Sequence, residues 1–145
     1  FSALSMAITL PSDGILISLD KNSEFSSKAQ SFYEKAKEKK IKQIIKPAIE
    51  SLKELKKSGQ KFDLIFIDAD KENYVNYFNQ VSNKLNKNGI IISDNVLWSG
   101  KVLDSKQKDE ETSTLVKFNK IINEDKRFTS IILPIRDGIS ISRLV

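Results

Sequence analysis

Short apolar runs alternate with longer amphipathic segments along most of this chain. The apolar runs have the length of strands, and the longer segments repeat apolar residues at helical spacing. We predict strands over Gly14–Asp20, Ile41–Ile45, Phe62–Asp68 and Ile90–Ser93. We predict helices over Ser2–Leu10 (the tail of a helix), Glu24–Lys39, Pro47 to the stop at Ser58-Gly59, Tyr74–Leu85 and, after a loop from Val96 to about Lys108, through Asn123.

The end of the chain departs from this alternation. Phe128–Pro134 and Gly138–Arg143 are predicted strands joined by Arg136-Asp-Gly, a turn signal typical of an antiparallel hairpin. The strand Phe62–Asp68 is apolar on both faces, as expected of a parallel strand covered by helices. The pattern predicts an α/β fold with an open, mostly parallel sheet and a C-terminal antiparallel hairpin.

Polar residues follow three of the predicted parallel strands. Asp20, Asp68 and the pair Asp94-Asn95 each stand at the carboxyl end of a strand. Ligands of open α/β sheets bind beyond these strand ends. We therefore expect all three groups on the functional rim of the sheet.

The composition limits the classes of function. A length of 145 residues suits one domain, and 39% hydrophobic residues indicate a globular chain. No apolar run reaches the roughly 18–20 residues of a membrane helix, and we expect a cytoplasmic protein without membrane contact. The net charge of +5 lies largely in Lys35–Lys46 and Lys53–Lys61. Glutamates interrupt both segments and no aromatic ladder accompanies them, so nucleic acid is an unlikely partner.

The chain contains no cysteine and no histidine. Thiolate and imidazole chemistry are therefore excluded, and any metal should be held by oxygen atoms. Asp68, Asp94 and Asn95 together offer two carboxylates and an amide oxygen, which suit Mg²⁺ or Ca²⁺. The alternative is that each is a loop cap.

Three further residues have two interpretations each. Asp20 could accept hydrogen bonds from a nucleotide ribose, or cap a turn. Lys71 could be a base, since burial beside a cation lowers the pKa of a lysine, or one of many surface lysines. Trp98 could stack on a flat substrate, or pack its loop onto the domain.

Three segments resemble one known family. Phe-Ile-Asp-Ala-Asp-Lys-Glu-Asn-Tyr (66–74), Ile-Ser-Asp-Asn-Val-Leu-Trp-Ser-Gly-Lys-Val (92–102) and Leu-Pro-Ile-Arg-Asp-Gly-Ile-Ser-Ile-Ser-Arg (133–143) are similar to the caffeoyl-CoA O-methyltransferase-like family. Catechol O-methyltransferase is a more distant relative. The resemblance runs from residue 1 to the end and implies a Rossmann-like class I methyltransferase sheet that uses S-adenosylmethionine and a divalent cation.

The resemblance also implies roles for the residues on the metal and substrate side. Asp68, Asp94 and Asn95 match the metal ligands, with Mg²⁺ as first choice and Ca²⁺ or Mn²⁺ as alternatives. Lys71 matches the lysine that takes the hydroxyl proton, with Asp68 as its catalytic neighbour. Trp98 matches a substrate-side aromatic.

On the cofactor side, the resemblance assigns four residues to S-adenosylmethionine. Asp20 matches the acidic residue that holds the ribose, and Ser2 the serine after the glycine-rich loop. Ala48 matches a backbone position against the adenine, and Asp68 also lies near the methyl donor. Where the family has glycine before Pro-Ala, this chain has Lys46, whose side chain must point outward.

The family's Glu-Ile-Gly-x-x-x-Gly-Tyr segment should lie just before Phe1. We therefore expect residues 1–145 to be one N-terminally truncated methyltransferase domain that lacks its first strand. That strand would lie between those ending at Asp20 and Asp68, and without it two strand edges stay unpaired. We expect this segment alone to fold poorly and to be inactive.

The implied activity is methyl transfer to a hydroxyl of a small catechol-like acceptor by a homodimer. Two alternatives are an S-adenosylmethionine-dependent RNA methyltransferase and a non-catalytic nucleotide-binding module. The first would usually carry an Asn/Asp-Pro-Pro-Tyr-type motif or a catalytic cysteine, which this sequence lacks. The second leaves Asp68 and Asp94-Asn95 without a purpose.

Overall fold

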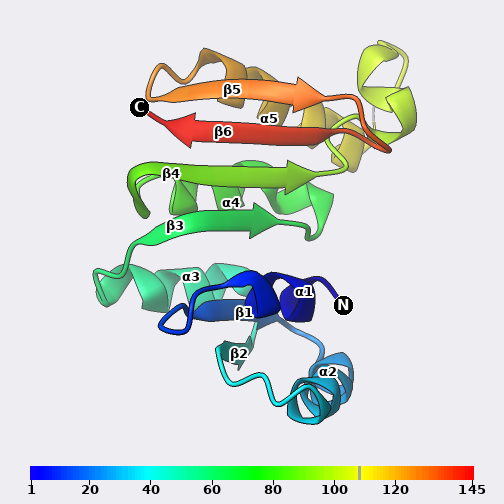
Figure 1. Cartoon of the computed structure of the whole chain (residues 1–145). Coiled ribbons are helices and arrows are strands. Elements are labelled where there is room, and N and C mark those ends of the chain that lie inside the picture. Colours follow the sequence, from blue (N-terminus) through cyan, green and yellow to red (C-terminus); the bar gives the residue numbers. More distant parts are fainter. Residues whose placement is uncertain (108) are drawn as a thin grey trace. The chain divides into compact units, whose positions relative to one another are not determined.

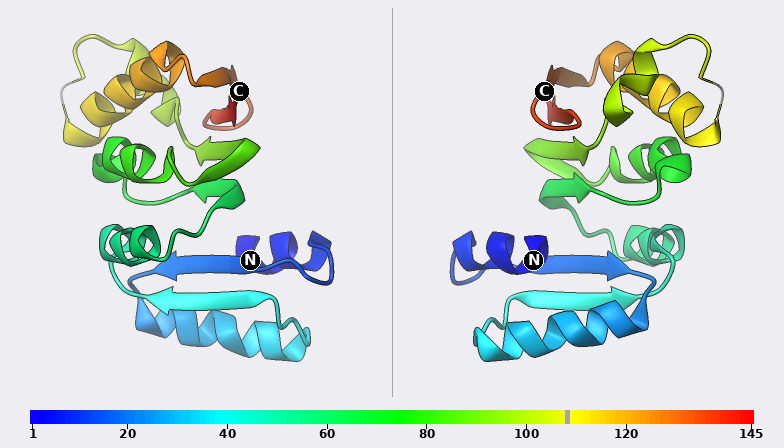
Figure 2. Two further views of the ribbon diagram at one scale, coloured as in Figure 1. Left: turned by 90° about the vertical axis from the view of Figure 1, so that its left-hand side faces the viewer. Right: turned by 90° about the vertical axis from the view of Figure 1, so that its right-hand side faces the viewer.

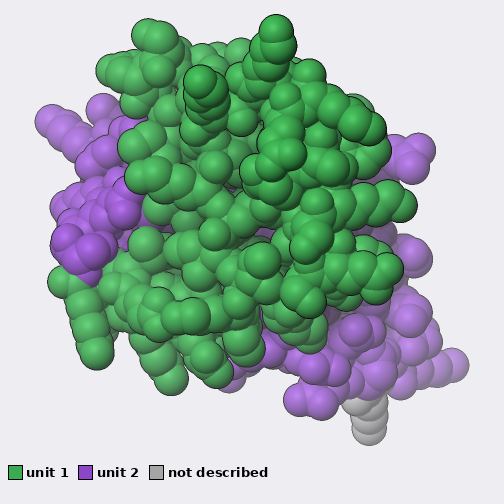
Figure 3. Space-filling view, turned by 90° about the horizontal axis from the view of Figure 1, so that it is seen from below, with its two compact units in different colours: residues 1–57 green, residues 58–145 purple. Residues whose placement is uncertain are grey.

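The computed structural model describes residues 1–107 and 109–145, so Lys108, at the end of the predicted loop, lies outside the described residues. It divides into two compact units, Phe1–Lys57 and Ser58–Val145 (Figures 1 and 3). Each unit is described by itself. No helix in the described part of the chain is long and apolar enough to cross a membrane.

The unit Phe1–Lys57 contains a two-stranded parallel sheet. Its strands β1 and β2 pair from Leu16 opposite Ile41 to Asp20 opposite Ile45, which confirms both predicted strands. In chain order its elements are α1 (Ser2–Thr9), β1 (Leu16–Asp20), α2 (Ser23–Lys35), β2 (Ile41–Ile45) and α3 (Ala48–Lys57).

Helix α2 ends four residues earlier than predicted. Asn22 caps its start, since the side-chain oxygen of Asn22 accepts a hydrogen bond from Phe25 N at 2.9 Å. At the other end Lys37 takes a left-handed φ of 54°, and Glu38 N donates to Tyr33 O at 2.9 Å. This bond across five residues is typical of a helix end closed by a left-handed residue. The predicted continuation to Lys39 is therefore wrong.

The unit Ser58–Val145 contains a four-stranded sheet in the order β3-β4-β6-β5. Strands β3 and β4 are parallel, whereas β4 pairs with β6 and β6 with β5 in antiparallel fashion, which confirms the predicted C-terminal hairpin. The elements are β3 (Phe62–Ile67), η1 (Lys71–Asn73), α4 (Tyr74–Val81), β4 (Leu85–Asp94), η2 (Trp98–Leu103), α5 (Glu110–Glu124), β5 (Phe128–Leu133) and β6 (Ile139–Leu144).

The helix predicted over Tyr74–Leu85 is too long. It ends at Val81, and Leu85 instead begins strand β4 opposite Phe62. Leu85 has helical spacing from Phe78 and Val81, but it is buried and pairs with Phe62 in the sheet. The register shifts after this pair, and Asn88 takes a left-handed φ of 63°.

The two faces of the four-stranded sheet differ. Helices α4 and α5 lie on one face (Figure 2), where Phe118 packs edge-on against Tyr74 and Phe78. On the other face Leu64 and Phe66 of β3 are 48% and 38% exposed. The prediction that β3 is buried on both faces is therefore wrong, because both helices cover the face of Ile67. Within the described residues, β1 and β3 each pair along one edge only.

Candidate functional site

The candidate site of the unit Ser58–Val145 lies at the carboxyl ends of β3 and β4. Asp68 directly follows β3, Asp94 is the last residue of β4, and Asn95 comes next. The two strands are parallel, with Ile67 opposite Ser93, so these ends share one edge of the sheet. Lys71 stands in the short helix η1 that follows β3.

Lys71 is buried, with 6% of its surface exposed. Its Nζ donates to Tyr74 Oη at 2.5 Å and to Asn95 Oδ1 at 3.1 Å, and lies 3.6 Å from Asp68 Oδ1. The ammonium group also lies 4.5 Å from the centre of the Tyr74 ring. The alternative of a surface lysine is therefore wrong.

Burial lowers the pKa of Lys71 below its ordinary value, because the charged form loses its hydration. The carboxylates of Asp68, Asp94 and Asp137 oppose this shift by favouring the ammonium form. The balance favours proton release more than at a surface lysine. Burial likewise raises the pKa of Tyr74, with Asp68 adding to the effect, so Tyr74 stays a neutral hydrogen-bonding group.

Tyr74 joins the two strand ends, a role that the sequence reasoning missed. Its hydroxyl donates to the backbone oxygen of Asp94 at 2.8 Å while accepting from Lys71. The sequence feature that could have predicted this contact is the spacing of Tyr74 three residues after Lys71, because residues three apart lie on the same side of a helical turn. A buried tyrosine hydroxyl requires a polar partner, and here that partner is the end of the neighbouring strand.

The predicted metal ligands are hard oxygen donors, and two of the three contact the same cationic atom. Asp68 Oδ1 and Asn95 Oδ1 both face Lys71 Nζ, and Asp94 Oδ1 accepts from Asn95 N at 2.7 Å. Asn95 takes a left-handed φ of 57°, which asparagine tolerates. Among the described residues no group of three His, Cys, Asp or Glu could hold a metal. Asp68, Asp94 and Asn95 instead offer two carboxylates and one amide oxygen, which are hard donors of the kind that Mg²⁺ accepts.

Trp98 lies beside this cluster. Its ring centre is 5.8 Å from Lys71 Nζ and 5.9 Å from Lys101 Nζ. The side chain is half-buried, and within the described residues its buried Nε1 has no hydrogen-bond partner. The Trp98 ring therefore lies against Lys71 at the candidate site, with one part of the side chain buried and another exposed.

In the unit Phe1–Lys57, the predicted cofactor residues are held by few side-chain contacts. Asp20 is exposed at the end of β1, and its Oδ1 accepts from Asn22 N at 2.8 Å. Its backbone oxygen accepts from Lys46 N at 3.0 Å, which brings Asp20 close to the Pro47-Ala48 segment. Ser2 is exposed in α1, and no hydrogen bond found in the described residues joins it to Asp20 or Ala48.

Lys46 points outward, as predicted. Its Nζ donates to Glu54 Oε1 at 2.8 Å, and both side chains are about half exposed. Glu54 raises the pKa of Lys46 by this hydrogen bond and by its charge. Lys46 therefore lies at the surface between β2 and α3, where it pairs with Glu54 of α3.

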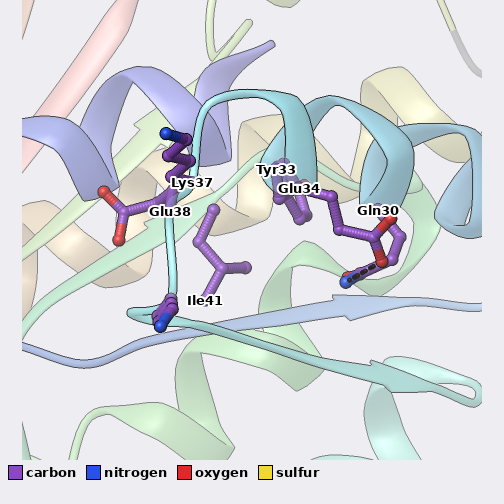
Figure 4. A pocket seen from close by; sticks show the side chains of 7 residues that line it. Gln30, Tyr33, Glu34, Lys37, Glu38 and Ile41 are labelled. Atoms are coloured by element: carbon purple, nitrogen blue, oxygen red, sulfur yellow. Dashed lines mark hydrogen bonds between the residues drawn. The ribbon is translucent and has the colours of Figure 1, made fainter.

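The same unit has an open depression of about 730 Å³ (Figure 4). It lies between α2 and the start of β2, whereas Asp20 lies at the end of β1. None of the predicted site residues lines it. The lining residues are Gln30, Tyr33, Glu34, Lys37, Glu38, Lys39 and Ile41.

A family model described as O-methyltransferase matches residues 1–145. The chain belongs to this O-methyltransferase family. The resemblance and the fold class predicted from the sequence are both confirmed. The family fold accounts for the parallel strands and the antiparallel hairpin seen here.

Individual relatives and solved structures support the same family assignment. The chain is 36% identical over 144 residues to "Probable caffeoyl-CoA O-methyltransferase 2" of Dictyostelium discoideum, covering 97% of this chain and 62% of that protein. It is 34% identical to caffeoyl-CoA O-methyltransferase of Stellaria longipes, covering 100% and 64%. An O-methyltransferase from Bacillus cereus, crystallised with SAH, has a TM-score of 0.92 at 26% identity, covering 99% and 69%. The chain thus spans less than two thirds of these curated relatives.

Proposed function

We propose that the complete protein transfers a methyl group from S-adenosylmethionine to a hydroxyl of a small catechol-like acceptor, assisted by a divalent cation. The observation that carries this proposal is the buried Lys71 in contact with Asn95 and Asp68 at the ends of two parallel strands. Membership in the O-methyltransferase family supports the reaction type. The names of the caffeoyl-CoA relatives support an acceptor with neighbouring hydroxyls.

The cofactor assignment follows the Bacillus cereus relative, whose structure contains SAH. We assign Ser2, Asp20, Ala48 and Asp68 to S-adenosylmethionine. The exposed Asp20 carboxylate could accept hydrogen bonds from a ribose, because only one backbone N–H donates to it in the described structure. The homodimer and the cytoplasmic location stay predictions.

Asp68, Asp94 and Asn95 would hold the cation, with Mg²⁺ as first choice and Ca²⁺ or Mn²⁺ as alternatives. A divalent cation at these oxygens would orient the acceptor and make its hydroxyl more acidic. Asn95 Oδ1 accepts from Lys71, and an amide oxygen has a second lone pair. The residues therefore fit a hard cation.

Lys71 in its neutral form takes the proton from the acceptor hydroxyl, since burial lowers the pKa of its ammonium group. The hydroxyl oxygen then forms a bond to the methyl carbon as the carbon–sulfur bond breaks, leaving S-adenosylhomocysteine. Asn95 and Tyr74 hold Lys71 in place for this step. Trp98 would stack on the acceptor ring and exclude water.

The test is methyl transfer by the complete protein to a panel of catechols, including caffeoyl thioesters, in Mg²⁺ and in EDTA. We expect methylation of a vicinal diol that EDTA abolishes. Activity that persists unchanged in EDTA would contradict the metal's role. Cofactor binding without methylation of any diol would show that the acceptor class is wrong.

Substitutions of Asp94 make this test specific to the site. Asp94→Ala should reproduce the effect of EDTA, and Asp94→Asn should do so while keeping an oxygen that can accept from Asn95 N. The matched control is Asp63→Ala near the start of β3, which also removes one carboxylate and one hydrogen bond, the bond from Asn86 Nδ2. Loss of activity in the control as well would mean that the Asp94 effect is not specific.

A further inference from the structure

The loop after β4 has an unusual backbone conformation. Asn95, Trp98 and Ser99 have φ values of 57°, 49° and 53°, and Gly100 has 79°. Left-handed φ values are uncommon for residues other than glycine and costly for bulky side chains such as tryptophan. Such a segment keeps its shape only when contacts from elsewhere hold it. This segment carries Asn95 and Trp98, the amide and the ring of the candidate site.

The turn between β5 and β6 supplies these contacts. Gly138 N donates to Ile135 O at 3.0 Å, which closes the turn. The turn then accepts two backbone N–H groups of the loop, Val96 N to Gly138 O at 3.1 Å and Leu97 N to Asp137 O at 2.9 Å. Figure 1 shows the loop and the turn at the same end of the sheet.

The Asp137 carboxylate adds a third bond, and it is directed at the left-handed residues themselves. Its Oδ1 accepts a hydrogen bond from Ser99 N, one residue after Trp98. A carboxylate forms a stronger bond to a backbone N–H than a neutral oxygen does. Asp137 therefore restrains the backbone on the C-terminal side of the Trp98 ring.

Close packing at the next residue keeps this carboxylate in position. Gly138 has a left-handed φ of 81°, and a Cβ there would lie 2.4 Å from Leu97 Cγ. Only glycine permits this approach between the turn and the loop. On the other side of the loop, Asn119 Nδ2 of α5 donates to Val96 O at 2.8 Å. The loop is thus held from two sides, by α5 and by the turn.

We propose that Asp137 is a positioning residue that fixes the loop carrying Trp98 and so sets the acceptor side of the site. Asp137 has no contact with the reacting atoms in this scheme. Its charge also favours the ammonium form of Lys71. The positioning effect passes through Ser99 N to the orientation of Trp98, whose ring centre lies 5.8 Å from Lys71 Nζ. The part of this inference that concerns the acceptor rests on the proposed function, whereas the restraint of the loop does not.

The test uses Asp137→Ala and Asp137→Asn in the complete protein. The fluorescence of Trp98, the one tryptophan of residues 1–145, is isolated by subtracting the spectrum of the matching Trp98→Phe variant. We expect Asp137→Ala to make Trp98 more accessible to acrylamide. We also expect the KM for the acceptor to rise roughly tenfold, as loss of one charge-assisted hydrogen bond implies, with the KM for S-adenosylmethionine unchanged. Asp137→Asn should give a smaller rise in both quantities, because a neutral acceptor forms a weaker bond.

Asp63→Ala is the matched control and should leave both readouts at their wild-type values. Unchanged Trp98 quenching and unchanged acceptor KM in Asp137→Ala would overturn the proposal, as would equal effects on both substrates. If Asp137→Ala does not fold, Asp137→Asn decides by the same criteria. If the wild type methylates no diol, the proposed function fails, but the fluorescence still decides whether Asp137 restrains the loop.

Discussion

The unit Ser58–Val145 encloses Lys71, whereas the unit Phe1–Lys57 leaves Lys46 at its surface. Lys46 lies 2.8 Å from its carboxylate partner Glu54, and Lys71 lies 3.6 Å from Asp68. By distance alone the Lys46 pair would be the stronger one. The Lys71 side chain is 7% exposed, however, and that of Lys46 is 47% exposed. Exposed ion pairs are screened by water, so burial rather than distance decides which lysine has a lowered pKa.

The carboxylates of Asp94 and Asp20 differ in the same way, since one is held by neighbouring groups and the other is exposed. Asp94 is the last residue of its strand. Its backbone oxygen accepts a hydrogen bond from Tyr74, and its carboxylate accepts one from Asn95 N. Asp20 ends a strand too, but its carboxylate accepts from one backbone N–H and is otherwise exposed in the described structure. We infer that the Asp94 side of the fold is organised before any ligand binds. The Asp20 carboxylate, in contrast, would be fixed in position only when a cofactor binds to it.

The largest expected effect comes from Lys71→Met. Removing a general base lowers kcat by about 10³-fold if Lys71 takes the acceptor proton. Lys117→Met, an exposed lysine of α5, is the matched control and should keep wild-type activity. The measurement is steady-state methylation of a diol with saturating Mg²⁺. A fall in kcat of less than about tenfold would show that the cation alone suffices to activate the hydroxyl.

The next effect tests the other unit. Asp20→Ala should weaken binding of S-adenosylhomocysteine roughly 10- to 100-fold, because hydrogen bonds to a charged acceptor are lost. The melting temperature should change little, since Asp20 is exposed. Titration calorimetry measures the affinity, and Asp13→Ala, in the turn before β1, is the control. Equal affinities of Asp20→Ala and wild type would remove Asp20 from the cofactor site.

A smaller effect compares two buried tyrosines of α4. Tyr74→Phe removes the hydroxyl that joins Lys71 to Asp94, so we expect kcat to fall about tenfold and stability to fall by about 1 kcal/mol. Tyr77→Phe removes a hydrogen bond of 2.6 Å to Asp70 Oδ1, outside the candidate site. It should lose similar stability with unchanged kcat. If both variants lost activity equally, Tyr74 would matter only for folding.

The sequence predicted the candidate rim because strand ends are local features. Asp68 and Asp94-Asn95 follow apolar runs, and the parallel pairing of those runs brings them together. It did not predict the Tyr74 and Asp137 contacts, which join residues 20 and 38 positions apart. For the same reason helical spacing extended α4 to Leu85, since the pairing of Leu85 with Phe62 is a long-range contact.

The smallest expected effect returns to Lys46, at the position where the resemblance implies glycine. Its ion pair with Glu54 is exposed on both sides, and such pairs contribute little to stability. Lys46→Ala should therefore leave the melting temperature unchanged, with Lys42→Ala as an exposed control on β2. The affinity for S-adenosylhomocysteine should also stay within about twofold of the wild type, because exposed charge pairs are weak. A several-fold change in affinity would mean that Lys46 faces the cofactor. Lys46 and Lys71 would then differ in the ligand that each contacts, and not only in how deeply each is buried.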